Sequence, residues 1–216
     1  MDIYRESSLP RLTHSYLEYL QHFNTGKLLE DVAQCYTPST VLRLACALQV
    51  ETRRAVALVL GFIGTYDANS ALGKMLRDPD RSVRLLAENS IKNVWPRDGS
   101  ETQRHMLRQI MRNVNSLQFD EAVRLANILL EECPLYAEAR NQRAIALFAM
   151  GDFQNAIEDG NIVLDLNPYH FGAAIGLGHA YKKLNDTESA VFYFQKALEI
   201  NPNLESIRRH IERMVK

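Results

Sequence analysis

The sequence predicts an all-α protein, a right-handed α-solenoid built of antiparallel helix pairs. Three observations lead to this prediction. The second half of the chain repeats itself with a 34-residue step, and the first half has a weaker repeat with a 31-residue step. No stretch alternates apolar and polar residues as a half-buried strand would. Internal periods of this length are typical of stacked helical repeats.

The first half of the chain is predicted to begin with three helices, over residues 10–23, 27–36 and 38–49. Thr37 is suited to cap the third helix, and Pro38 suits its first position. The next two helices are related by the 31-residue step, which aligns Arg53 with Arg84 and Leu60 with Ile91.

Residues 78–91, DPDRSVRLLAENSI, resemble a HEAT repeat. Asp78, Val83, Arg84 and Ala87 match the turn aspartate, valine, arginine and alanine of that family. In the family, the aspartate and arginine help to form a ladder between stacked units. The preceding unit has Ala47 in place of the aspartate, so we expect the ladder to be interrupted there. The resemblance implies HEAT-like helical repeats over residues 1–97.

A break is predicted at the segment PRDGS, residues 96–100, with Trp95 packed at the junction. Beyond it, two residue types recur with the 34-residue step. They are Ala122, Ala156 and Ala190, and Pro134, Pro168 and Pro202. Each unit reads as two helices, in which small residues such as Ala156 and Gly160 let a neighbouring helix approach closely.

This pattern resembles the tetratricopeptide repeat. The resemblance implies units over about residues 103–136, 137–170 and 171–204 within a domain of residues 101–216, and a capping helix over residues 203–215. In the middle and third units the matching positions are Ala144, Leu147, Ala156, Gly160, Val163 and Pro168, then Leu177, Gly178, Tyr181, Ala190, Phe194, Ala197 and Pro202. The first unit departs from the pattern in its opening helix, at Ile110 and Asn113. In the capping helix, Leu204, Ile207, Ile211 and Met214 form an apolar stripe.

The composition is that of an ordinary globular protein, with 46% hydrophobic residues and a formal net charge of −1. Neither half has the basic excess expected of a nucleic-acid-binding protein. The start lacks a signal-peptide pattern, and the longest apolar run is too short to span a bilayer, so we expect a cytoplasmic protein without membrane insertion. The cysteines Cys35, Cys46 and Cys133 are widely spaced, and we expect reduced, mostly buried thiols.

No catalytic, cofactor or metal motif stands out. The six histidines do not pair with each other at i, i+4, and the HExxH, GxSxG and Walker patterns are absent. The adjacent acidic pairs Glu131–Glu132 and Glu158–Asp159 diverge by about 100° on a helix, so we expect them to be solvated. HEAT-like repeats also occur in bilin lyases and some DNA glycosylases, but none of their sites can be transferred to this chain. Of the three functions considered for this chain, catalysis is therefore the least favoured.

The function that the sequence favours is that of a non-catalytic adaptor or scaffold, which binds a peptide or helix of a partner protein. In the tetratricopeptide-repeat family the first helix of each unit lines a concave groove. The residues that the resemblance places there are Leu107, Met111, Val114, Asn141, Ile145, Phe148, Ile175, His179 and Lys182, bordered by Lys183.

The groove residues suggest two kinds of contact. The side-chain amide of Asn141 suits a peptide backbone, and the end with His179 and the two lysines suits an acidic segment. Some relatives use a clamp of lysine, asparagine and arginine for a terminal carboxylate. That clamp is not expected, because Leu107, Met111, Gln142, Gly172 and Gly176 stand in its places.

The alternative is that these positions are covered by the capping helix, by the HEAT-like block or by a second copy of the chain. The protein would then be a structural module for self-association or assembly.

Overall fold

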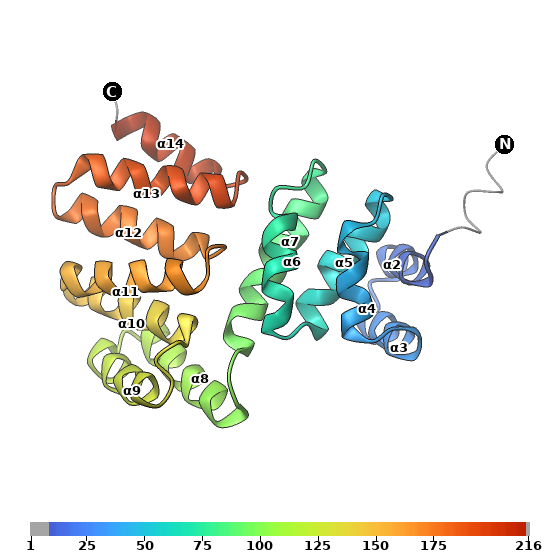
Figure 1. Ribbon diagram of the computed structural model, residues 1–216, viewed down its shortest axis with the longest axis horizontal. Helices are drawn as coiled ribbons and strands as arrows, with labels where there is room; N and C mark the ends of the chain where they lie inside the picture. Colours follow the sequence, from blue (N-terminus) through green and yellow to red (C-terminus); the bar gives the residue numbers. More distant parts are fainter. Residues whose placement is uncertain (1–8, 215–216) are drawn as a thin grey trace. The chain divides into compact units, whose positions relative to one another are not determined.

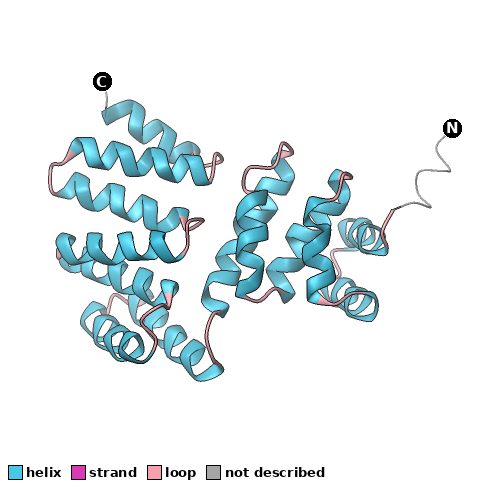
Figure 2. Cartoon of the chain, in the orientation of Figure 1, coloured by secondary structure: helices cyan, strands magenta, loops and turns pink. Residues whose placement is uncertain are grey.

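The computed structural model describes residues 9–214, and the chain in this range is helical (Figures 1 and 2). It contains thirteen α-helices and three short 3-10 helices, and no strand within these residues. The all-α prediction is confirmed. The chain divides into two compact units, Met1–Val94 and Trp95–Lys216.

The first unit contains six described α-helices. They are α2 (Arg11–His22), α3 (Thr25–Cys35), α4 (Pro38–Arg43), α5 (Val50–Ile63), α6 (Asn69–Met75) and α7 (Arg81–Val94), with the 3-10 turns η1 (Leu44–Cys46) and η2 (Tyr66–Ala68). The side chain of Thr37 accepts a hydrogen bond from the Thr40 amide, as expected of an N-cap. Helix α5 packs along α7, where Gly61 leaves room for Ser90.

The helix predicted over residues 38–49 ends early, since α4 stops at Arg43 and η1 at Cys46. The turn that follows is held by the side chain of Arg53. Its Nη1 donates to the carbonyl oxygens of Ala47 and Leu48, at 3.0 Å each.

The same arrangement recurs at the turn before α7. Arg84 Nη1 donates to the carbonyl oxygens of Asp78 and Pro79, at 2.9 and 3.0 Å. The carboxylate of Asp78 also accepts two hydrogen bonds from Arg53, at 2.7 and 3.0 Å. One arginine therefore fixes the end of its own turn and, through Asp78, the turn that follows. Ala47 has no carboxylate with which to make the corresponding link.

The second unit begins with the 3-10 turn η3 (Trp95–Arg97) and continues as seven α-helices. They are α8 (Glu101–Asn115), α9 (Phe119–Glu132), α10 (Ala137–Met150), α11 (Phe153–Leu166), α12 (Phe171–Lys183), α13 (Thr187–Ile200) and α14 (Glu205–Met214). Consecutive helices pack against each other along the unit. Helix α10 also contacts both α8 and α12, so the first helices of the pairs lie side by side in one layer.

The 34-residue step corresponds to the packing of this unit. The recurring alanines are buried at 0, 6 and 0% exposure, at Ala122, Ala156 and Ala190. The apolar stripe predicted for the C-terminal helix packs into one cluster with Ala190 and Phe194. The exposed residues of α14 include three arginines, which leaves a polar outer surface at this end of the unit.

One expectation about single residues needs correction. Cys35 and Cys46 are exposed and Cys133 is half-buried, because the first two stand at helix ends on the surface. The indole of Trp95, predicted to pack at the junction, stacks on the His170 ring with centroids 3.9 Å apart, inside the second unit.

Candidate partner-binding groove

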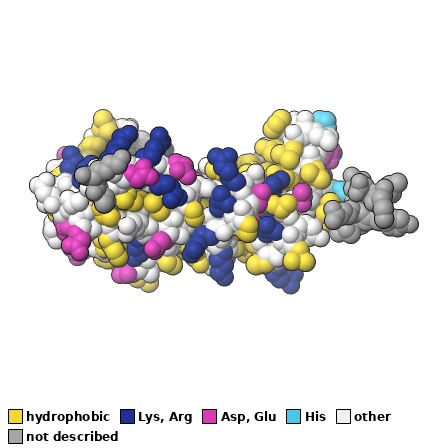
Figure 3. Space-filling view, turned by 90° about the horizontal axis from the view of Figure 1, so that it is seen from above, with side chains coloured by type: hydrophobic (Ala, Val, Ile, Leu, Met, Phe, Trp, Pro, Cys, Tyr) yellow, Lys and Arg dark blue, Asp and Glu magenta, His cyan; other side chains and the backbone are white. Residues whose placement is uncertain are grey.

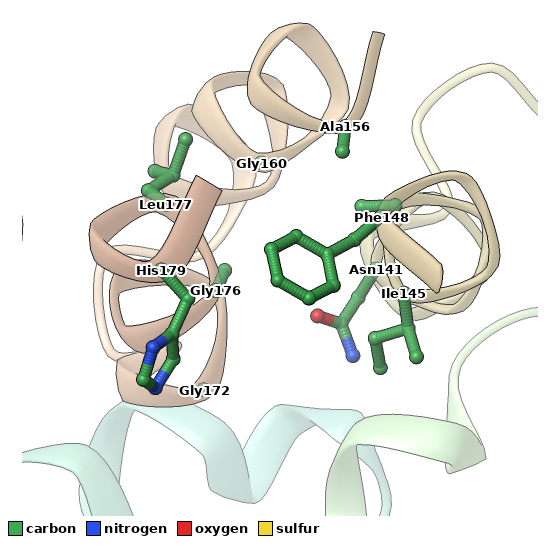
Figure 4. Close-up of a pocket in the computed structure, with 11 residues that line it drawn as sticks. Asn141, Ile145, Phe148, Ala156, Gly160, Gly172, Gly176, Leu177 and His179 are labelled. Carbon is green, nitrogen blue, oxygen red and sulfur yellow. The ribbon is translucent and has the colours of Figure 1, made fainter. Parts of the chain in front are cut away.

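An apolar pocket of about 140 Å³ lies between α10 and α12, with α11 behind them. Figure 4 shows Phe148 and Asn141 projecting from α10 towards α12, and Ile145 of α10 beside them. Ala156 and Gly160 of α11 also line it. A cavity on the order of 150 Å³ with apolar walls can hold a molecule the size of benzene. The pocket therefore has room for one large apolar side chain.

Two glycines on α12 keep the pocket open. Gly172 and Gly176 are one helical turn apart and both line it (Figure 4). A Cβ placed on Gly176 would meet no atom within 4 Å, so the space in front of it is empty. Glycine costs helix stability, by roughly 0.5–1 kcal/mol relative to alanine. No atom of a neighbouring helix lies close enough to require glycine at position 176, in contrast to Gly178.

The polar group of the pocket is held in one orientation. Asn141 Nδ2 donates to Glu138 Oε1 over 3.1 Å, and Asn141 Oδ1 takes no part in this hydrogen bond. The same Glu138 oxygen accepts from Gln142 Nε2 at 2.7 Å. A carboxylate only accepts, so it fixes which end of the amide faces it. Asn141 can offer its carbonyl oxygen to a donor in the pocket.

Glu138 is in turn held by a buried histidine. His170 Nδ1 accepts from the Ala173 amide at 3.0 Å, so the proton of the neutral ring is on Nε2. That Nε2 lies 3.1 Å from Glu138 Oε2 and donates to it. Both side chains are buried, at 1 and 5% exposure, and Trp95 stacks on the ring. A chain of contacts thus connects Trp95 with Asn141.

Apart from Leu107, the residues predicted to line the groove fall into three groups. Asn141, Ile145, Phe148 and His179 line the pocket. Ile175, Met111 and Val114 are half-buried and pack against the core clusters. Lys182 and Lys183 are exposed beside the pocket without lining it.

Leu107 is different, since its exposure is 0% and it packs with Ile110, Leu129 and Tyr136. It offers no surface to a ligand. Helix α8 begins at Glu101, two residues before the start expected for that repeat unit, and its side chains belong to the first core cluster.

A small basic cluster borders the pocket through His179. The His179 and His210 rings are 5.7 Å apart, and Lys182 Nζ lies 3.1 Å from His210 Nε2. Burial first, and then the positive charge of neighbours such as Lys182, lowers the pKa of both imidazoles below the ordinary 6.5. Both rings are therefore neutral at pH 7, and His210 can accept a hydrogen bond from the lysine ammonium.

Asp159 was expected to face water and is instead 2% exposed. Arg143 donates to its two carboxylate oxygens at 2.7 Å each, and Arg140 donates at 3.3 Å. Arg143 also donates to Asn127 of α9 at 2.7 Å. The carboxylate connects α10 to α11 and has a structural task. One feature of the sequence could have indicated this ion pair. Helix α10 carries two arginines three residues apart, and helix α11, which follows it, has no basic residue of its own.

Within residues 9–214, no group of three or more histidine, cysteine or acidic side chains is arranged to hold a metal ion. None of the helices described in this range is long and apolar enough to cross a bilayer.

Models of the tetratricopeptide repeat match residues 108–171 and 173–204. The C-terminal unit is a tetratricopeptide-repeat (TPR) domain. The chain is similar to a TPR repeat-containing protein of Rhizobium etli, with 30% identity over 136 residues. That alignment covers 60% of this chain and 62% of the relative, so less than two thirds of the relative is represented.

Solved structures are similar in fold. The first TPR domain of the protein Spaghetti, bound to an HSP90 peptide, matches with a TM-score of 0.52 and 21% identity, over 54% of this chain and 93% of that one. MamA matches with a TM-score of 0.43 and 21% identity, over 88% of this chain and 97% of that one. At the first of these scores the similarity supports a common fold for the TPR domain.

Proposed function

We propose that this protein is a non-catalytic adaptor that holds a peptide or helix of another protein in the groove of its TPR domain. The observation that carries the proposal is the apolar pocket between α10 and α12, which Gly172 and Gly176 leave open. The exposed side of Ile145, at 42%, extends the apolar surface beyond it. Exposed apolar patches of this kind mark contact sites. The related fold of Spaghetti is bound to a peptide, which supports the same use here.

In this arrangement each residue has a definite role. A large apolar side chain of the partner enters the pocket beside Phe148. Asn141 Oδ1 accepts a hydrogen bond from the partner's backbone, because Glu138 engages the other end of the amide. Glu138 and His170 are positioning residues, since they are buried and act through Asn141.

The test uses the full chain and peptides selected from a random display library. Gly176→Leu fills the pocket, and the free space at this position lets the side chain enter without displacing the backbone. Gly176→Ala is the matched control. We expect selected peptides to bind Gly176→Leu at least about tenfold more weakly than the wild type, while Gly176→Ala changes little.

Equal binding by the wild type and Gly176→Leu would contradict the proposal, as would a library that yields no peptide. A separate check is sedimentation across a range of concentrations. Self-association that Gly176→Leu abolishes would show that a second copy occupies the groove.

We also propose that the N-terminal unit consists of HEAT-like repeats over residues 1–97, with the TPR domain over residues 101–216. The geometry of Arg53, repeated at Arg84, supports this. Arg53→Gln should lower the melting temperature, because Asp78 then loses both of its bonds from Arg53. Arg43→Gln, on the exposed face of α4, is the control. An unchanged melting temperature for Arg53→Gln would remove this support.

A further inference from the structure

Charge is divided between the two layers of the TPR domain. The first helices of the pairs and the C-terminal helix, α8, α10, α12 and α14, carry ten Lys/Arg and four Asp/Glu residues. The second helices, α9, α11 and α13, carry two Lys/Arg and nine Asp/Glu residues. The layer that holds the pocket is therefore basic and the other layer acidic, although the chain as a whole is almost neutral.

Not all of this positive charge is available to a ligand. Arg140 and Arg143 are neutralised in part by Asp159, and Arg208 lies 3.6 Å from Glu205. Lys182, Lys183 and Arg213 differ from these. Among the described residues, no carboxylate lies within ion-pair distance of any of the three, and all three are exposed. Figure 3 views the domain from the side of α14 and shows Lys and Arg side chains there, with Asp and Glu side chains beside them.

These cations are continuous with the pocket. His179 lines the pocket and its ring contacts His210, to which Lys182 donates. The lowered pKa of both histidines reflects in part the positive charge around them. Exposed cations that have no partner raise the local concentration of anionic ligands and steer them into the site.

We propose that the segment bound in this groove is acidic. A large apolar side chain occupies the pocket, and Asp or Glu side chains of the same segment lie against Lys182, Lys183 and Arg213. The proposal rests on the groove being the binding site, as proposed above, and adds the chemistry of the partner.

The geometry also sets the spacing of the motif. Lys182 follows the pocket residue His179 by about one helical turn, which is roughly 5 Å along α12. An extended peptide advances by roughly 3.3 Å per residue. The first acidic residue therefore stands within about two or three positions of the apolar anchor. Gly172 and Gly176 carry no positive charge that could bind a terminal carboxylate. The acidic segment therefore need not be the C-terminal end of the partner's chain.

Two measurements on the selected library peptides test the charge preference. The first is the net charge of the selected sequences compared with the unselected library, for which we expect an acidic excess close to one large apolar residue. The second is the affinity for Lys182→Glu, compared with Lys196→Glu on α13 as a control for the same charge change. We expect Lys182→Glu to weaken binding about fivefold or more, and Lys196→Glu to change it little. Replacing the peptide's acidic residues by their amides should produce a similar loss.

The outcomes separate the two proposals. Peptides that lose affinity for Gly176→Leu but are neutral or basic, or that bind Lys182→Glu unchanged, would overturn the acidic preference and leave the groove proposal standing. Peptides that bind Gly176→Leu as well as the wild type would overturn both. Self-association that Lys182→Glu abolishes would identify the acidic layer of a second copy as the occupant and overturn the separate partner.

Discussion

Two of the three glycines of helix α12, Gly176 and Gly178, face different sides of the TPR domain. A Cβ on Gly178 would come within 2.5 Å of the Phe194 ring on α13, whereas a Cβ on Gly176 would meet nothing within 4 Å. The packed face uses a missing side chain to bring two helices together. On the open face, the space left by the missing side chain of Gly176 stays empty. The residue type alone does not reveal the use of a glycine, whereas the space in front of it does.

The largest effect is expected on the packed face, where Asp159 is buried between two arginines. Asp159→Asn should destabilise the protein by about 3 kcal/mol, because it leaves Arg140 and Arg143 facing each other without a carboxylate. Urea unfolding measures the change. Glu158→Gln on the adjacent exposed position is the control and should stay within about 0.5 kcal/mol. A loss of similar size in both variants would show that the Asp159 ion pairs are not the cause.

The next effect concerns Gly178 itself. Gly178→Ala should lower stability by about 2 kcal/mol, since the new methyl group must displace the Phe194 ring. Chemical denaturation is again the measurement. A variant as stable as the wild type would show that the ring can move aside without cost, and the contrast between the two faces would weaken.

Gly176→Ala should have the opposite sign. Alanine favours the helix over glycine by roughly 0.5–1 kcal/mol, and here the methyl group meets no neighbour. We expect a small gain in unfolding free energy in the same assay. A loss would mean that the open face is packed in solution, by a second copy or by another part of the chain.

The smallest effect is a pH dependence at the end of the domain. Folding lowers the pKa of His179 and His210, through burial first and then through nearby positive charge such as that of Lys182. The unfolded chain therefore binds protons more readily, and stability falls as the pH drops below about 6.5. His210→Gln should reduce this decline. Melting temperatures from pH 7.5 to pH 5.5 measure it, and an equal decline in the wild type and the variant would exclude His210 as a source.

Much of the fold follows from the sequence, because periodic packing leaves a periodic pattern. The alanines of the 34-residue step are buried where helices approach each other, and the final apolar stripe packs as predicted. Structural features that do not repeat along the chain could not be predicted from this pattern. After the end of α4, Arg53 donates to the carbonyl groups of Ala47 and Leu48, a contact that neither helix propensity nor hydrophobic pattern encodes.

The candidate site was predictable only in part, for the same reason. Repeat register placed Asn141, Ile145, Phe148 and His179 near one groove, and the structure brings them to one pocket. Register alone also selected Leu107, which the structure buries in the core. The network from Trp95 through His170 to Glu138 joins residues far apart in the chain, because Trp95 precedes the repeats while Glu138 and His170 stand at opposite ends of one unit. No local pattern indicates such a contact.

Nuclear magnetic resonance shows which residues contact a bound peptide, and it can therefore test whether the pocket between α10 and α12 is the binding site. A ¹H–¹⁵N titration of the full chain with a selected library peptide reports on every glycine amide and on the side-chain amide of Asn141. We predict that the signals of Gly172, Gly176 and Asn141 move most, while that of Gly61, on α5 of the N-terminal unit, stays in place. Shifts confined to α9 and α13, with Gly172 and Gly176 unchanged, would contradict the claim.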